Sequence, residues 1–258
     1  MNRFFVICFL FLLSCSNNEI KKREFGKAQV SFSYNSKDTC IDFNSLNTKI
    51  RDGIISKKEA LSEIKIVLPK LRNYFYKNGG QDFQKSNWIF PVEGYSSNAI
   101  GGTNGSGFNL CRYDYFDGNK HSGHPAQDIF IKDKNQDCFD DSKNKIVNIL
   151  SMTGGIVIAT ETNWDTTSNL RGGKYIWIYE PTSNSFFYYA HNSSVKVKPL
   201  DIVKPGDIIA TVGRTGLNAF KKRSPTHLHL MQLKLDNDGY PKPINCYPVL
   251  ITIAKKNN

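Results

Sequence analysis

Two histidines one residue apart, His227 and His229, stand in the segment THLHL of a chain that has only five histidines. On a β-strand, residues i and i+2 point to the same face, so these two imidazoles project together while Leu228 and Leu230 face the core. Two imidazoles on one face can approach a single metal ion. An isolated pair of this kind is more often two polar surface residues, so the pair alone decides nothing.

Three further residues with metal-binding chemistry lie in two other short segments. His124 and Asp128 stand four apart in HPAQD, and His191 ends the aromatic run YYAH. A catalytic zinc ion takes three protein ligands from neutral histidine and carboxylate, and it leaves one position open for water. His124, Asp128 and one member of the THLHL pair supply that set. The other member and His191 are then free to polarise the water or to donate to an oxyanion.

Five segments follow one another along the chain in this order: HPAQDIFI, TGGIVIA, YYAH, VKPGDIIATVGRTG and THLHL. In this order they resemble the motifs of the lysostaphin-like, LytM-type zinc endopeptidases of peptidoglycan, over about residues 88–235. The resemblance implies that Zn2+ is held by His124, Asp128 and His229. It also implies catalytic roles for His191 and His227, which would orient the water and stabilise the tetrahedral intermediate.

Some residues depart from the pattern of that family. Ala126 replaces the glycine of the first motif, and Met231 stands where the family often has an acid. A basic stretch, LNAFKKRSP, lengthens the approach to THLHL and contains Lys221, Lys222 and Arg223. The implied metal ligands and catalytic histidines are all present. These departures therefore concern substrate preference more than catalysis.

The elements that must position these residues are short β-strands. Apolar and aromatic runs separated by Gly, Pro, Asn and Asp predict a mostly antiparallel arrangement. The predicted strands are 156–160, 174–180, 185–191, 207–213 and 227–235. We therefore expect a mainly β fold, with an antiparallel β-sheet LytM-like metallopeptidase domain and an N-terminal helical extension.

One long helix is predicted before the sheet domain. Ser56 and Glu59 form a capping-box pattern, and Asn78-Gly79-Gly80 ends the helix. Pro69 falls inside and is expected to kink it. The apolar residues at spacings of three and four are Leu61, Ile64, Leu68, Leu71 and Phe75. The expected domain organisation is a tether at 15–45, the helical extension at 46–87 and the LytM-like domain at 88–258.

Residues 1–14 are predicted to be a lipoprotein signal peptide. Arg3 precedes an apolar run of ten residues, Phe4 to Leu13, which is too short to span a bilayer. The run ends in Leu-Leu-Ser-Cys, which resembles a bacterial lipobox and makes Cys15 the lipidated residue. Ser16 follows, with no aspartate, as in Gram-negative lipoproteins of the outer membrane. We expect an extracytoplasmic protein, anchored in the outer membrane and facing the periplasm; an ordinary signal peptide cut elsewhere is the alternative.

Four cysteines remain after the signal segment: Cys40, Cys111, Cys138 and Cys246. Outside the cytoplasm disulfides persist, and four cysteines allow three pairings that sequence alone does not distinguish. A Cys111–Cys138 bridge would bracket residues 124–128, and free buried thiols are the alternative.

The formal net charge is +11, and the lysines are spread through the loops. No predicted helix or strand carries a phased row of Lys and Arg with interleaved aromatics, which argues against nucleic-acid binding. A basic exported protein is better suited to an anionic polymer outside the cytoplasm, such as wall peptides with free carboxylates.

These observations predict a zinc endopeptidase that acts on peptidoglycan stems or cross-links. For a lipoprotein of a diderm bacterium, analogy points to the bond between D-alanine and diaminopimelate. One alternative is a non-hydrolytic LytM-like module that binds the wall or activates a partner amidase. Another is a polyanion-binding lipoprotein whose histidines are incidental. His121, three residues before His124, is a competing ligand candidate.

Overall fold

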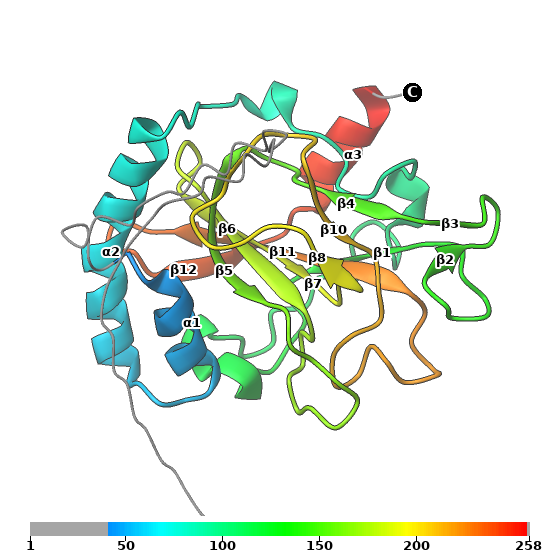
Figure 1. Ribbon diagram of the computed structural model, residues 1–258, viewed down its shortest axis with the longest axis horizontal. Helices are drawn as coiled ribbons and strands as arrows, with labels where there is room; N and C mark the ends of the chain where they lie inside the picture. Colours follow the sequence, from blue (N-terminus) through cyan, green and yellow to red (C-terminus); the bar gives the residue numbers. More distant parts are fainter. Residues whose placement is uncertain (1–40, 257–258) are drawn as a thin grey trace, which may run out of the picture. The chain divides into compact units, whose positions relative to one another are not determined.

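A seven-stranded antiparallel sheet runs through the part of the chain that the structure, a computed structural model, describes, residues 41–256 (Figure 1). Strand β11 lies second from one edge of this sheet, where it pairs on one side with β7 and on the other, the edge side, with both β1 and β12. The strands are, in spatial order, β1 (Gln127–Phe130), β11 (His227–Leu235), β7 (Ser185–Ala190), β6 (Tyr175–Glu180), β5 (Gly155–Glu161) and β9 (Ile202–Val203), with β12 (Pro241–Ile244) beside the second half of β11.

A smaller sheet and the C-terminal helix cover one face of the large sheet. The smaller sheet has the order β4 (Asn148–Leu150), β10 (Ile208–Thr211) and β8 (Ser194–Val195), and the helix is α3 (Tyr247–Lys256). Side chains such as Ile178, Leu228 and Leu230 of the large sheet pack in one buried cluster with Ile209 and Leu250. A separate hairpin, β2 (Phe139–Asp140) and β3 (Lys145–Ile146), lies outside both sheets.

Two N-terminal helices cover the opposite face of the large sheet. They are α1 (Phe43–Arg51) and α2 (Lys57–Lys77), blue to cyan in Figure 1, and the short helix η3 (Tyr115–Lys120) adjoins α1. Their apolar residues form a second cluster with Trp177, Phe186 and Leu233. The two clusters use alternate residues of each strand, because successive side chains of a strand point to opposite faces. Two further short helices, η1 (Lys85–Asn87) and η2 (Ser97–Ala99), connect the helical segment to the sheets.

The predicted fold class is confirmed, and so are the predicted strands. Strand β11 spans the predicted residues 227–235, and Leu228 and Leu230 are buried in the core as expected. Sequence reasoning did not find α1, α3 or β12. Helix α1 begins at Phe43, inside the segment 15–45 that was expected to be a tether. None of the helices in residues 41–256 is long and apolar enough to cross a bilayer.

Helix α2 begins and ends where the sequence predicts. Ser56 and Glu59 form both hydrogen bonds of the capping box, and Asn78 is the C-cap. The helix continues through Pro69, which is exposed. The buried stripe is Ala60, Ile64, Val67, Leu71 and Phe75, so two of the five predicted core positions, Leu61 and Leu68, lie half-buried at its edge.

The predicted Cys111–Cys138 bridge is wrong. Cys111, Cys138 and Cys246 are free thiols. Cys111 is exposed in the loop before η3, whereas Cys138 is tied into the turn before β2 by its N–H, which donates to Asp133. Cys40 lies outside the described residues.

The packing of α2 on the sheet predicts a contrast between two isoleucines of the same helix. Ile64 is 0% exposed and Ile66 is 61% exposed. Ile64→Ala is expected to lower the free energy of unfolding by about 2–5 kcal/mol, because it leaves a cavity in the core. Ile66→Ala, the matched control, should change it by less than about 0.5 kcal/mol. Urea denaturation of both variants measures the contrast, and equal effects would show that α2 does not pack as described.

Candidate metal centre

The pairing of β1 with β11 places a carboxylate directly opposite a histidine. Asp128 is the cross-strand partner of His229, and Phe130 is the partner of His227. Directly opposite residues of an antiparallel pair project to the same face. The Oδ1 atom of Asp128 therefore lies 3.1 Å from Nδ1 of His229.

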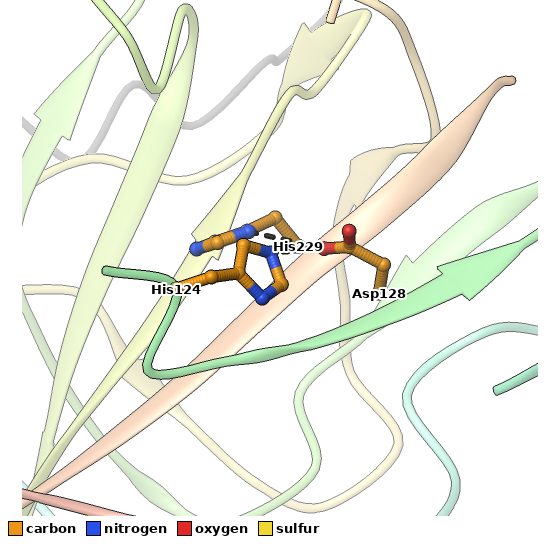
Figure 2. Close-up of side chains that lie close together, drawn as sticks. All are labelled: His124, Asp128 and His229. Carbon is orange, nitrogen blue, oxygen red and sulfur yellow. Dashed lines mark hydrogen bonds and ion pairs between the residues drawn. The ribbon is translucent and has the colours of Figure 1, made fainter. Parts of the chain in front are cut away.

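His124 reaches the same point from the segment that leads into β1 (Figure 2). Its backbone exchanges hydrogen bonds with Asn109, which fixes where the side chain begins. Its Nε2 lies 3.2 Å from Oδ1 of Asp128, and its Nδ1 lies 2.8 Å from the carbonyl oxygen of Gly107. One ligand-type atom from each of His124, Asp128 and His229 lies within 4.8 Å of the others.

The two remaining histidines of interest surround this group. Nε2 of His227 lies 3.8 Å from Oδ1 of Asp128. The ring of His191 is centred 4.9 Å from that of His227 and 5.4 Å from that of His229. All five residues singled out in the sequence, from three distant segments, thus lie in one cluster.

Backbone carbonyl groups fix the orientation of His191 and His227. Nδ1 of His191 lies 2.8 Å from the carbonyl oxygen of Thr215, and Nδ1 of His227 lies 2.7 Å from that of Pro225. A carbonyl oxygen only accepts hydrogen bonds, so these contacts assign the proton to Nδ1 and leave a lone pair on Nε2. His191 is held further by its own N–H, which donates to Gly172. Its φ of +66° lies in the left-handed region, which histidine adopts more readily than most residues.

The electrostatics favour an ionised carboxylate among largely neutral imidazoles. Burial alone would raise the pKa of Asp128, but hydrogen bonds with His124 and His229 hold it well below its usual range. Burial lowers the pKa of His229, and burial together with the neighbouring His227 holds the pKa of His191 well below normal. For His124 burial also acts to lower the pKa, but the hydrogen bond to Asp128, the charge of that carboxylate and the hydrogen bond to Gly107 together outweigh burial, and the pKa is raised.

This donor set fits a transition metal of the zinc type. Zinc binds imidazole nitrogen and carboxylate oxygen in sites with three protein ligands, whereas Mg2+ and Ca2+ prefer all-oxygen surroundings. The contact of Nδ1 of His124 with Gly107 is the kind of outer hydrogen bond that orients a metal-ligating histidine. His124, Asp128 and His229 are therefore able to hold such an ion.

A cavity of about 390 Å3 opens over the cluster, and we call it the metal groove. Its walls come from three loops, at 121–123, 171–172 and 218–225. Of the basic stretch noted in the sequence, Arg223 lines the groove, and Lys221 and Lys222 do not.

His121 also lines the metal groove but does not join the ligand group. Its ring packs edge-on against Tyr113, with centroids 5.0 Å apart, and its Nδ1 lies 3.3 Å from the carbonyl oxygen of Ser122. Burial and the nearby Arg171 lower its pKa to about 4. Within the described residues, the cluster of possible metal ligands consists of His124, Asp128 and His229 and does not include His121.

Residues 138–241 match the model of peptidase family M23. The chain carries a peptidase family M23 domain. The match contains His191, His227 and His229 but begins ten residues after Asp128. The β1–β11 pairing places Asp128, which lies outside the matched segment, opposite His229 within it, and His124 lies close to both.

Solved structures of similar proteins include several peptidases. A Ruminococcus gnavus protein described as a LytM glycyl-glycine endopeptidase is 27% identical, with a TM-score of 0.43 over 67% of this chain and 63% of that one. Lysostaphin from Staphylococcus simulans is 23% identical, with a TM-score of 0.35 over 51% and 44%. A zinc-containing peptidase from Vibrio cholerae is 21% identical, with a TM-score of 0.39 over 66% and 42%. The aligned part of this chain spans less than two thirds of each of these proteins.

Sequence reasoning missed the residues that orient the histidines. Thr215 accepts from His191 through its carbonyl oxygen, while its hydroxyl accepts from the Lys174 N–H and donates to the Asn192 carbonyl. The sequence signal that points to Thr215 is the segment GRTG, which belongs to one of the five motifs. The motif alone does not reveal that Thr215 orients His191.

The tight packing behind His191 predicts the effect of a single methyl group. A Cβ at Gly216 (φ +115°) would collide with the carbonyl oxygen of Arg171 and lie 2.9 Å from Nδ1 of His191, whereas one at Gly206 (φ +97°) would meet only Ile89, at 3.6 Å. Both alanine variants should lose about 1–2 kcal/mol of stability through the positive φ, and Gly216→Ala should lose more because of its backbone clash. Only Gly216→Ala should also break the hydrogen bond to Thr215 and shift the ring 15N resonances of His191. Unchanged His191 resonances in a folded Gly216→Ala protein would contradict this arrangement.

Proposed function

We propose that this protein is a zinc-dependent endopeptidase that hydrolyses peptide bonds in peptidoglycan stems or cross-links. The observation that carries the proposal is the convergence of His124, Asp128 and His229, within 4.8 Å, beside the M23 segment. His124, Asp128 and His229 would hold the ion. Bound zinc supplies a Lewis acid that polarises a peptide carbonyl and lowers the pKa of water.

His191 and His227 supply the proton transfers in this proposal. Each presents Nε2 as a proton acceptor, because its Nδ1–H is engaged by a backbone carbonyl. Nε2 of either ring can accept a proton from the attacking water. Once protonated, it donates to the developing oxyanion or to the leaving amine. The carbonyl partners Thr215 and Pro225 also stabilise the protonated rings by accepting from Nδ1.

The proposed substrate follows from charge and shape. The open metal groove, with Arg171 and Arg223 on its walls, is suited to a flexible peptide that carries carboxylates. The net charge of +11 favours the same class of polymer. Within that class we propose the bond between D-alanine and diaminopimelate, which rests on analogy with diderm cell walls.

Removal of one proposed ligand tests the enzyme directly. His229→Ala is expected to lose stoichiometric zinc and to reduce muropeptide release by more than about 100-fold, because loss of one of three ligands costs more than loss of an outer hydrogen-bond partner of a ligand. The matched control is His121→Ala, which removes a histidine that lines the groove outside the ligand group and should retain zinc. Metal analysis and chromatography of digested peptidoglycan give the two readouts. Zinc-loaded wild type without muropeptide release would instead indicate a wall-binding module or an amidase activator.

We also propose that the protein is a lipoprotein anchored through Cys15 in the outer membrane, facing the periplasm. The lipobox-like segment that supports this lies outside the described residues. Cys15→Ser is expected to abolish incorporation of radiolabelled palmitate and to release the protein from membranes, since acyl chains supply the anchoring free energy. Labelling that persists in Cys15→Ser would show that the anchor is wrong, and Cys111→Ser serves as a cysteine control.

A further inference from the structure

A second, smaller cavity adjoins the metal groove, and we call it the side cavity. Its volume is about 70 Å3, and it shares His121, Arg171 and Gly172 with the groove. It lies where α1 and η3 meet the sheet, so aromatic side chains of the second core cluster form much of its wall. A space of this size accommodates a carboxylate and a small side chain but not a sugar ring.

The two arginines that line the side cavity differ in their partners. The guanidinium of Arg51 lies 2.7 Å from a carboxylate oxygen of Asp52 and 2.7 Å from one of Glu161. Arg171 is half-buried, and its one side-chain hydrogen bond in the described residues goes to the carbonyl oxygen of His121. No carboxylate of residues 41–256 forms an ion pair with it. A guanidinium has five N–H donors, so Arg171 has donors left for a ligand.

The residues of 41–256 that line the side cavity include no Asp or Glu that could neutralise the charge of Arg171. Met231, uncharged, is the cross-strand partner of Tyr188 on the same sheet face, and both line the side cavity. Tyr188 is half-buried, and its hydroxyl has no hydrogen-bond partner among the described residues. Gly172 matters here, because a Cβ at that position would collide with the Tyr188 hydroxyl. A cation and a free hydroxyl thus face a small cavity that has aromatic walls.

We propose that the side cavity is a substrate subsite in which Arg171 binds a free carboxylate of the peptide. The inference rests on the proposed peptidase function and specifies its substrate as a peptide with a carboxylate close to the cleaved bond. A guanidinium and a carboxylate form two parallel hydrogen bonds, and partial burial strengthens them relative to water. The closeness to the cleaved bond follows from Arg171 and Gly172, which line both cavities.

The test compares two substrates and three proteins. The substrates are a cross-linked muropeptide dimer with free carboxylates and the same dimer with its carboxylates amidated. For wild type we expect KM to be roughly 10-fold lower for the free acid, the size expected of hydrogen bonds to a charged group. Arg171→Gln should abolish this preference by raising KM for the free-acid dimer to that for the amidated dimer. Arg112→Gln, which removes an exposed charge that lines neither cavity, should retain it.

A purely structural role of Arg171, through its bond to the loop at His121, would give a different result. Arg171→Gln would then lower kcat on both substrates and retain the ratio of their KM values, which overturns the proposal. Equal KM values for wild type also overturn it while leaving the peptidase function intact. Arg171→Lys, which retains the charge but not the planar fork, is expected to retain part of the preference and serves if the glutamine variant does not fold.

A binding measurement separates this inference from the peptidase function. Calorimetric titration of the metal-free protein with the free-acid and amidated dimers does not depend on hydrolysis. Tighter binding of the acid, lost in Arg171→Gln, supports the subsite even if the wild-type protein hydrolyses neither dimer. Equal binding of both dimers by metal-free wild type contradicts it.

Discussion

The register between β1 and β11 is the constraint on which the site depends. It sets Asp128 against His229, two residues that lie 101 positions apart in the chain. A slip by one residue would turn Asp128 to the opposite face and into the apolar core, so the buried alternation of β11 strongly specifies the pairing. On its other side β11 pairs with β7, which sets Ala190 beside His229 and leaves His191 at the end of the strand. One strand therefore positions candidate site residues from both of its neighbours, Asp128 on β1 and His191 at the end of β7.

The face that carries the site is also the face that the N-terminal helices cover. Helix α1 supplies Asn47 and Arg51 to the wall of the side cavity, and Tyr175 joins them through hydrogen bonds from both side chains. Helix α1 thus contributes both to the packing of the sheet and to the wall of the side cavity. A segment expected from sequence to be an extension is, in the structure, part of one compact unit with the sheet domain.

The parts of the fold that sequence predicted are those with a local periodic signal. Strand β11 alternates polar and apolar residues on either side of the adjacent pair Leu230-Met231, and α2 carries both a capping box and an apolar stripe. Sequence also predicted that His124, Asp128, His191, His227 and His229 belong together, because histidines are rare in this chain and the motifs recur in order, and the structure brings the five into one cluster. Helix α1 and β12 lack such signals: α1 is short, and β12 is an edge strand with two prolines. Arg171 was not found because its significance lies in a missing ion-pair partner, which depends on contacts between distant segments.

In the proposed function, exposed lysines attract the substrate, whereas the half-buried Arg171 discriminates between substrates. Exposed lysines act through water and salt, where charge interactions are screened beyond about 8 Å at physiological ionic strength. They raise the local concentration of any anionic polymer and do not distinguish one peptide from another. Arg171 is half-buried and held by the loop at His121, so its interaction is directional and less screened. In the proposed function, selection among acidic peptides therefore belongs to the short-range chemistry beside the metal groove, even though most of the net charge of +11 lies elsewhere in the chain.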